Sequence, residues 1–168
     1  MPEPQSPATG YHVILGLGYV GLPLAQEATR SGLDVVGLDS SARVVSGLLA
    51  GRSHVDDLSD AEVGDMLAAG FTASQDPAVI AGAATVVICV PTPLSDDGGP
   101  DLGAVRSAGE SVGAYLRPGT LVVLESTTYP GTTEEVLLPI LEAGSGLKAG
   151  EDFNLAFSPE RIDPGNPV

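Results

Sequence analysis

Hydrophobic residues occur along this chain in short continuous runs, and stretches with a helical spacing of apolar residues separate most of them. The runs predict strands at residues 12–15, 34–39, 71–73, 85–90, 120–125 and 154–157. Helices are predicted after residue 21 and at residues 41–50, 60–69, 76–81, 101–116 and 131–143. Because the strands are rich in Val, Ile and Leu and do not alternate, the pattern favours an α/β fold with a doubly wound, mostly parallel sheet and helices on both faces.

The first run leads directly into Gly16-Leu-Gly18-Tyr-Val-Gly21, and a helical pattern follows. In such a segment Gly16 permits a tight turn, Gly18 allows phosphates to approach, and Gly21 lets the new helix pack against its strand. The peptide N–H groups near Tyr19 and Val20 would carry the positive end of the helix dipole, which favours a diphosphate without any Lys or Arg. The segment therefore predicts a Rossmann fold with a pyrophosphate-binding loop.

A carboxylate closes the second predicted strand. Asp39 follows Gly18 at close to the interval of about 20 residues at which a ribose-binding acid is expected. Its charge would repel a 2′-phosphate, so the sequence predicts NAD as the coenzyme. An alternative role for Asp39 is in the N-cap region of the next helix. Arg43, one turn into that helix, could instead accept a 2′-phosphate or stack on adenine, but with Asp39 present NAD remains the prediction.

Composition narrows the classes of partner. The chain has 168 residues and a formal net charge of −15, from 22 acidic and 7 basic residues. One ordinary domain has this length, and this charge argues against binding nucleic acid or an anionic membrane. No run approaches the roughly 20 apolar residues of a membrane helix. Residues 1–9 are polar and rich in Pro, which predicts a loose tail rather than a signal peptide.

The chain has one cysteine. Cys89 cannot form an internal disulfide framework and fits a reducing cytosol, so a cytoplasmic protein is expected. Because it lies inside the predicted strand at residues 85–90, we interpret it as a buried thiol of the core. No metal site is predicted.

Ligands of such sheets bind beyond the carboxyl ends of the strands. The loops at residues 16–21, 39–43, 90–93 and 125–131 are therefore expected to border one crevice. Thr92 lies between two prolines that have no N–H for the sheet, so its loop should leave the sheet and expose Thr92 to a ligand. The hydroxyls at residues 126–128 either line the site or cap the following helix, and both roles can hold together.

Four segments carry a resemblance to a known family. They are Gly-Leu-Gly-Tyr-Val-Gly-Leu-Pro-Leu-Ala at 16–25, Val-Pro-Thr-Pro at 90–93, Glu-Ser-Thr-Thr-Tyr-Pro-Gly-Thr-Thr-Glu at 125–134 and Phe-Ser-Pro-Glu-Arg-Ile-Asp-Pro-Gly-Asn at 157–166. The chain resembles the nucleotide-sugar dehydrogenases, which oxidise a UDP-sugar alcohol to a uronic acid with two NAD. The last segment and residues 53–57 are more similar to the UDP-N-acetylhexosamine branch than to UDP-glucose 6-dehydrogenases, which remain an alternative.

The resemblance implies roles for several residues. Val90, Pro91 and Thr92 would line the adenosine side of the NAD groove. Ser126 and Thr127 would lie near the nicotinamide and the reacting carbon, and Thr127 is expected to be an active-site residue.

Glu160 is the residue most similar to a catalytic one. The resemblance implies that Glu160 directs the water that hydrolyses a thioester intermediate, and that Arg161 holds the UDP-sugar or orients Glu160. An exposed charged loop is the alternative for this segment. At the position of Ile162 an acidic residue is as common in the family, so Ile162 weakens the assignment of the sugar.

The resemblance also implies a domain organisation and a partner. Residues 1–10 would be a flexible tail and residues 11–168 the NAD-binding Rossmann domain, with the central helix and the C-terminal UDP-binding domain absent. The nucleophilic cysteine would then lie in a downstream region, so the chain alone is expected to bind NAD and turn over nothing. The full-length protein would be a homo-oligomeric oxidoreductase of polysaccharide biosynthesis. A non-catalytic dinucleotide-binding or regulatory module remains the alternative.

Overall fold

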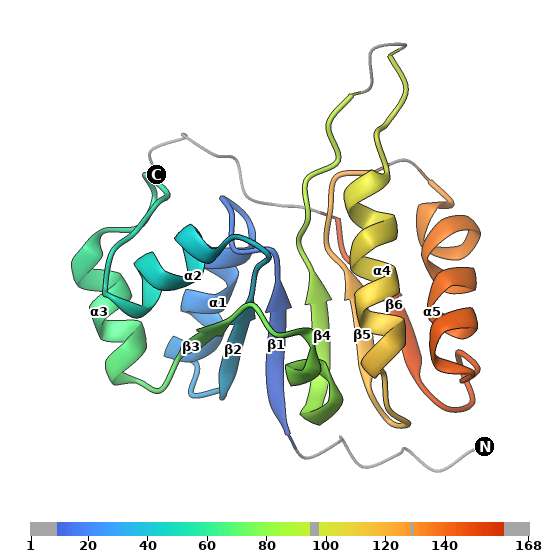
Figure 1. Cartoon of the computed structure of the whole chain (residues 1–168), viewed down its shortest axis with the longest axis horizontal. Helices are drawn as coiled ribbons and strands as arrows, with labels where there is room; N and C mark the ends of the chain where they lie inside the picture. Colours follow the sequence, from blue (N-terminus) through green and yellow to red (C-terminus); the bar gives the residue numbers. More distant parts are fainter. Residues whose placement is uncertain (1–9, 95–97, 129, 160–168) are drawn as a thin grey trace.

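The computed structural model describes residues 10–94, 98–128 and 130–159. Their backbone forms a six-stranded sheet in the order β3-β2-β1-β4-β5-β6, and every neighbouring pair of strands is parallel. Figure 1 shows these strands side by side across the molecule, from β3 on the left to β6 on the right. The strands are β1 (Tyr11–Leu15), β2 (Val35–Leu38), β3 (Thr72–Ser74), β4 (Ala83–Ile88), β5 (Leu121–Leu124) and β6 (Asn154–Phe157). The predicted doubly wound fold is therefore confirmed.

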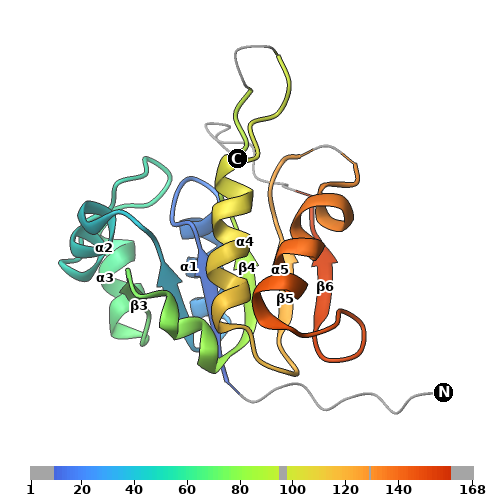
Figure 2. The ribbon, with the colours of Figure 1, turned by 45° about the vertical axis from the view of Figure 1, so that its right-hand side comes forward.

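Helices cover both faces of this sheet, as Figures 1 and 2 show. One layer packs against the β1–β3 half, and α4 and α5 stand on the opposite face over the β4–β6 half. The helices are α1 (Gly21–Arg30), α2 (Ala42–Leu49), α3 (Asp60–Ala68), η1 (Pro77–Gly82), α4 (Gly103–Tyr115), η2 (Thr132–Leu137) and α5 (Leu138–Ser145). Because all six strands are parallel, their carboxyl ends lie along one edge of the sheet.

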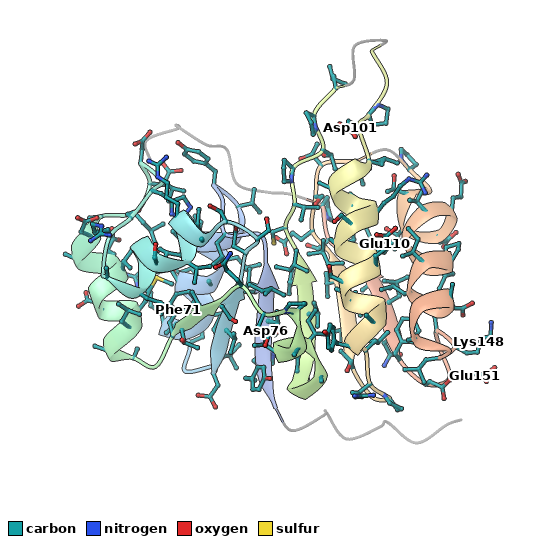
Figure 3. All side chains as sticks on the ribbon, in the orientation of Figure 1. Phe71, Asp76, Asp101, Glu110, Lys148 and Glu151 are labelled. Carbon is teal, nitrogen blue, oxygen red and sulfur yellow. The ribbon has the colours of Figure 1, made fainter. Side chains whose placement is uncertain are left out.

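Side-chain caps fix where several helices begin. Ser41 Oγ accepts a hydrogen bond from Val44 N at the start of α2. Ser59 and Glu62 form a reciprocal capping box at the start of α3, and an Asp76 side-chain oxygen accepts from Ala78 N before η1. Asp76 is labelled in Figure 3. These residues satisfy amide donors that the first turn of a helix leaves unpaired.

Two hydrophobic clusters lie on opposite faces of the sheet. The first joins the sheet to α4 and α5 and includes Val86, Val122, Val112, Leu137 and Leu141. The second joins the sheet to α1, α2 and α3 and includes Ile14, Leu22, Leu48, Val63 and Phe71, the last of which is labelled in Figure 3. Each cluster therefore joins one face of the sheet to the helices that cover that face.

Some predicted boundaries were wrong by a few residues. The strand predicted at residues 85–90 runs from Ala83 to Ile88, because β1 ends at Leu15 and Gly16 turns the backbone away from the sheet. Cys89 N makes the last bond to this neighbour, with Leu15 O. The helix predicted from residue 101 begins at Gly103, because the Asp101 carboxylate, labelled in Figure 3, accepts from Gly103 N outside the helix.

Candidate dinucleotide-binding site

Two positions in the turn after β1 leave no room for a side chain and are occupied by glycine. Gly16 has a φ of 93°, and a Cβ atom there would lie 2.5 Å from the carbonyl oxygen of Cys89. A Cβ atom on Gly21 would lie 1.7 Å from the carbonyl oxygen of Gly16. Both distances are too short for any side chain, so these glycines hold α1 against the carboxyl ends of β1 and β4.

The same turn presents unpaired amide groups. Within the ranges that the structure describes, the N–H groups of Gly18, Tyr19 and Val20 donate to no protein acceptor. Val20 is the N-cap of α1 and has no side-chain cap, and the first turn of α1 has no acidic residue. A Cβ atom on Gly18 would meet nothing within 4 Å. Open space beside unpaired donors at a helix N-terminus is the arrangement that binds a diphosphate.

Asp39 lies beside this turn, and both of its carboxylate oxygens accept backbone hydrogen bonds. Oδ2 accepts from Leu17 N and Oδ1 from Ser41 N, each at 2.9 Å. Because Ser41 is the N-cap of α2, the N-cap-region role foreseen for Asp39 is present in the structure. A carboxylate has about four acceptor positions, so two remain for ribose hydroxyls. The structural role and the predicted ribose role are therefore compatible.

A groove of about 480 Å³ lies over the carboxyl ends of β1, β2 and β4. It brings together Gly16, Asp39, Val90 and Pro91 from three of the four loops predicted to border one crevice. Its full lining is Leu15, Gly16, Leu38, Asp39, Ser40, Gln75, Pro77, Val90, Pro91, Ala104, Ser107, Ala108 and Ser111.

Sequence reasoning missed the other wall of this groove. It consists of Gln75 and Pro77, which precede or begin η1, and of small residues on α4. The available signal was the spacing of Ala104, Ser107, Ala108 and Ser111, which places small side chains on one face of a helix. Small side chains on that face leave room beside the sheet for a flat ligand.

Hydroxyl groups join the loop at residues 125–131 to the loop at residues 90–93. Ser126 is buried, and its Oγ donates to Val90 O at 2.9 Å. Thr92 Oγ1 donates to Thr127 O. Ser126, Thr127 and Thr92 therefore lie together next to the groove, although none of them lines it. Thr127 is exposed, and its own hydroxyl has no hydrogen-bond partner among the described residues.

The alternative role of this loop as a helix cap is not what the structure shows. The N-cap of η2 is Gly131, with a φ of 93° and no side-chain cap. Thr128 Oγ1 instead bonds Thr132 Oγ1 at 2.7 Å. The Ser126 hydroxyl thus connects two loops, the Thr128 hydroxyl bonds the first side chain of η2, and neither caps that helix.

The remaining predicted site residues lie elsewhere. Arg43 is exposed and lines a separate hollow beside α2, not the groove. Cys89 is buried in the second hydrophobic cluster, as predicted. Glu160 and Arg161 lie outside the described residues.

Two kinds of feature are absent from the part of the chain that the structure describes. No group of three or more His, Cys, Asp or Glu side chains gathers closely enough to hold a metal ion. No helix there combines the length and apolarity needed to cross a membrane.

Comparison with known proteins gives one family. A family described as the UDP-glucose/GDP-mannose dehydrogenase family, NAD binding domain, matches residues 12–168. Two curated relatives are each 40% identical over 154 residues: a UDP-N-acetyl-D-glucosamine 6-dehydrogenase of Pseudomonas aeruginosa and a UDP-N-acetyl-D-mannosamine dehydrogenase of Pyrococcus horikoshii. The matched regions cover 91% and 90% of this chain and 36% of each relative. The chain thus spans about 36% of the length of these relatives.

A solved structure has the same fold. A GDP-mannose dehydrogenase from Pseudomonas aeruginosa, in a ternary complex, superposes with a TM-score of 0.86 at 30% sequence identity. The superposition covers 91% of this chain and 36% of that protein. Together with the family match, it confirms the predicted Rossmann fold and the predicted coenzyme, NAD.

Proposed function

The chain belongs to the UDP-glucose/GDP-mannose dehydrogenase family, and from this premise we propose that it is the NAD-binding domain of a UDP-N-acetylhexosamine 6-dehydrogenase. The proposed enzyme oxidises the primary alcohol of the sugar to a carboxylate with two NAD. The two relatives that are 40% identical, both named for UDP-N-acetylhexosamines, support this substrate over the GDP-mannose of the 30% identical structure.

The unpaired amide donors at the start of α1 are the observation that carries the proposal. A Cβ atom on Gly18 would meet nothing within 4 Å, and Gly16 of the same turn lines the groove together with Asp39. Bound there, NAD supplies a hydride acceptor. The amides of Gly18, Tyr19 and Val20 would hold its diphosphate, Asp39 would accept from the adenosine ribose, and the groove would take the adenosine. This arrangement needs no basic residue, which suits a chain with a net charge of −15.

Thr127 would act at the reacting end of the site. Its hydroxyl is free among the described residues and its backbone carbonyl is held by Thr92, so the hydroxyl is available to contact the nicotinamide or the sugar. Ser126 would act by holding Val90 at the groove, because its own O–H is committed to Val90 O.

The second half of the reaction would depend on Glu160 and Arg161. In this proposal a cysteine adds to the aldehyde, a second hydride transfer gives a thioester, and Glu160 directs the water that releases the uronate. Cys89 is unsuited to be that nucleophile, because only 7% of it is exposed and it packs beneath Gly21. The cysteine therefore belongs to a region of the full-length enzyme that corresponds to the unmatched part of the relatives. We further propose that this enzyme is cytoplasmic and homo-oligomeric.

The test is NADH formation by the full-length protein with UDP-N-acetylglucosamine, UDP-N-acetylmannosamine, UDP-glucose and GDP-mannose. We expect kcat/KM for one N-acetylhexosamine to exceed that for UDP-glucose by at least about tenfold, since one lost polar contact costs about that factor. Glu160→Gln should slow uronate release but leave NAD binding unchanged. Preference for UDP-glucose would identify the other branch, and NAD binding without oxidation of any nucleotide sugar would indicate a non-catalytic module.

A further inference from the structure

A second hollow, of about 520 Å³, lies beside α2 and is separate from the groove. Its lining is Ser41, Arg43, Val44, Ser46, Gly47, Arg52, Ser53 and His54. Two of the chain's seven basic residues and three serines therefore border one space, and no acidic side chain lines it. Such a set of donors is suited to an anion.

The two arginines form no ion pair with any acidic residue that the structure describes. Among the described residues, the ion pairs join Arg30 to Glu27 and Lys148 to Glu142, and neither Arg43 nor Arg52 takes part in one. Two carboxylates bond to the backbone of lining residues and not to the arginines: Asp60 accepts from Ser53 N at 2.7 Å, and Asp39 accepts from Ser41 N at 2.9 Å. Within the described ranges, the guanidinium groups of Arg43 and Arg52 therefore have no carboxylate partner and are available to an anion.

The hollow and the groove share a wall. Asp39 and Ser40 line the groove, and the next residue, Ser41, lines the hollow. Leu17 also connects a residue of the groove with a residue of the hollow. Its N–H donates to Asp39 Oδ2 at 2.9 Å, and its carbonyl accepts from His54 Nε2 at 2.6 Å. A ribose hydroxyl bonded to Asp39 would therefore lie next to the entrance of the hollow.

We propose that this hollow is a phosphate subsite for the 2′ position of the adenosine ribose, and that the charge of Asp39 weakens the binding of a phosphate there. The inference rests on NAD binding in the groove and not on the identity of the sugar. Arg43 and Arg52 supply guanidinium donors that match a phosphate, and Ser41 Oγ, which accepts from Val44 N, still has its own O–H to donate. An arginine near the ribose-binding acid is the arrangement that accommodates NADP in this fold.

The experiment measures dissociation constants of NAD and NADP, by calorimetry, for the 168-residue chain and its variants. Asp39→Asn removes the repelling charge but keeps a side-chain acceptor, so NADP should bind at least about tenfold more tightly than to the unchanged protein. Adding Arg52→Gln or Arg43→Gln should abolish most of that gain. Arg106→Gln is the matched control, because Arg106 is exposed on α4 and lines neither space.

A second measurement does not depend on the folding of the Asp39 variant. In the otherwise unchanged chain, Arg52→Gln should weaken the binding of 2′,5′-ADP several-fold and leave the binding of 5′-AMP unaffected, since the two ligands differ only in the 2′-phosphate. Equal weakening of both ligands would assign Arg52 to the adenosine 5′-phosphate that they share and would overturn the proposal. So would an NADP affinity that Asp39→Asn does not raise in a variant that still binds NAD. If the unchanged chain does not bind NAD, the assignment of the groove to adenosine is wrong instead.

Discussion

The two halves of the sheet build their parts of the site from different materials. The β1–β3 half contributes main-chain amides and glycines, whose backbone is held by the side chains of Asp39, His54 and Gln75. The β4–β6 half contributes hydroxyls and small side chains, such as those of Ser126 and Ser107. Figure 2 shows each half with its own helix layer. The first half should therefore tolerate almost no change at the site, and the second should tolerate more.

Glycine itself has a different use in each half. Gly16 and Gly21 allow backbone to contact backbone at the ligand turn. In the second half, Gly113 and Gly144 let α4 and α5 approach, and a Cβ atom on Gly113 would lie 3.3 Å from Gly144 Cα. The first pair governs both binding and stability, whereas the second pair, far from the amide donors, should govern stability alone.

The largest effect is expected at Gly21. Gly21→Ala would place a methyl group 1.7 Å from Gly16 O, so the turn must open, and we expect a loss of about 3 kcal/mol or more in the free energy of unfolding. NAD binding should disappear with it. Denaturant unfolding and calorimetry on the same protein measure both.

Gly18→Ala is the matched control for that change. Its Cβ would contact nothing within 4 Å, so stability should stay within about 0.5 kcal/mol of the unchanged protein. The methyl group would nevertheless occupy the space proposed for the diphosphate, and affinity for NAD should fall at least about tenfold. Normal NAD binding by Gly18→Ala would show that the diphosphate lies elsewhere.

The next effect is expected in the second half, at Gly113. Gly113→Ala would press on Gly144 and on Ile140 O, both at 3.3 Å, and should lower the free energy of unfolding by about 1 to 2 kcal/mol. Its affinity for NAD should not change. The control is Gly64→Ala in α3, where nothing lies within 4 Å, which should raise stability by up to about 1 kcal/mol. Weakened NAD binding by Gly113→Ala would contradict the separation of the two halves.

The contrast explains which parts of the site could be predicted from sequence. The glycine turn and Asp39 follow from local backbone requirements, and those requirements appear as residue types at fixed spacings. The order of strands and helices follows from runs of apolar residues for a similar reason. The glycine turn and Asp39 belong to the first half, and the structure has both at the positions that the sequence predicts.

The second half was harder to predict because its contacts join residues far apart in the chain. The bond from Ser126 Oγ to Val90 O spans 36 positions, and the α4 wall of the groove depends on how that helix lies over the sheet. Arg43 shows the same limit: its place in the sequence suits a coenzyme ligand, but its side chain lines another hollow. Spacing along one strand or helix does not encode such contacts.

Ser126 tests how far this long-range bond matters. Ser126→Ala removes the donor to Val90 O, and we expect a loss of about 1 kcal/mol in the free energy of unfolding and a smaller loss of NAD affinity. Ser31→Ala is the control, because Ser31 is exposed and its hydroxyl has no hydrogen bond among the described residues. A Ser126 variant as stable as the Ser31 variant would show that β4 and β5 alone hold the two loops together.

The smallest effect concerns pH and compares one glutamate from each half. Hydrogen bonds from Ser59 lower the pKa of Glu62, and the hydrogen bond from Lys148 lowers the pKa of Glu142. Because both folded-state pKa values lie below the unfolded values, each contribution is present above the ordinary pKa of glutamate and is lost as pH falls through the folded pKa. Glu62→Gln or Glu142→Gln should therefore reduce the decline of stability on acidification.

Salt should separate these two glutamates. The Glu142 contact is an ion pair with Lys148 at 3.0 Å, whereas Glu62 bonds mainly to the uncharged groups of Ser59 and Gln26. Molar salt screens an exposed ion pair but has little effect on hydrogen bonds to neutral donors. In denaturant unfolding below and above the glutamate pKa, salt should therefore remove the effect of Glu142→Gln and preserve that of Glu62→Gln. Equal salt sensitivity would mean that charge, and not the capping box, lowers the pKa of Glu62.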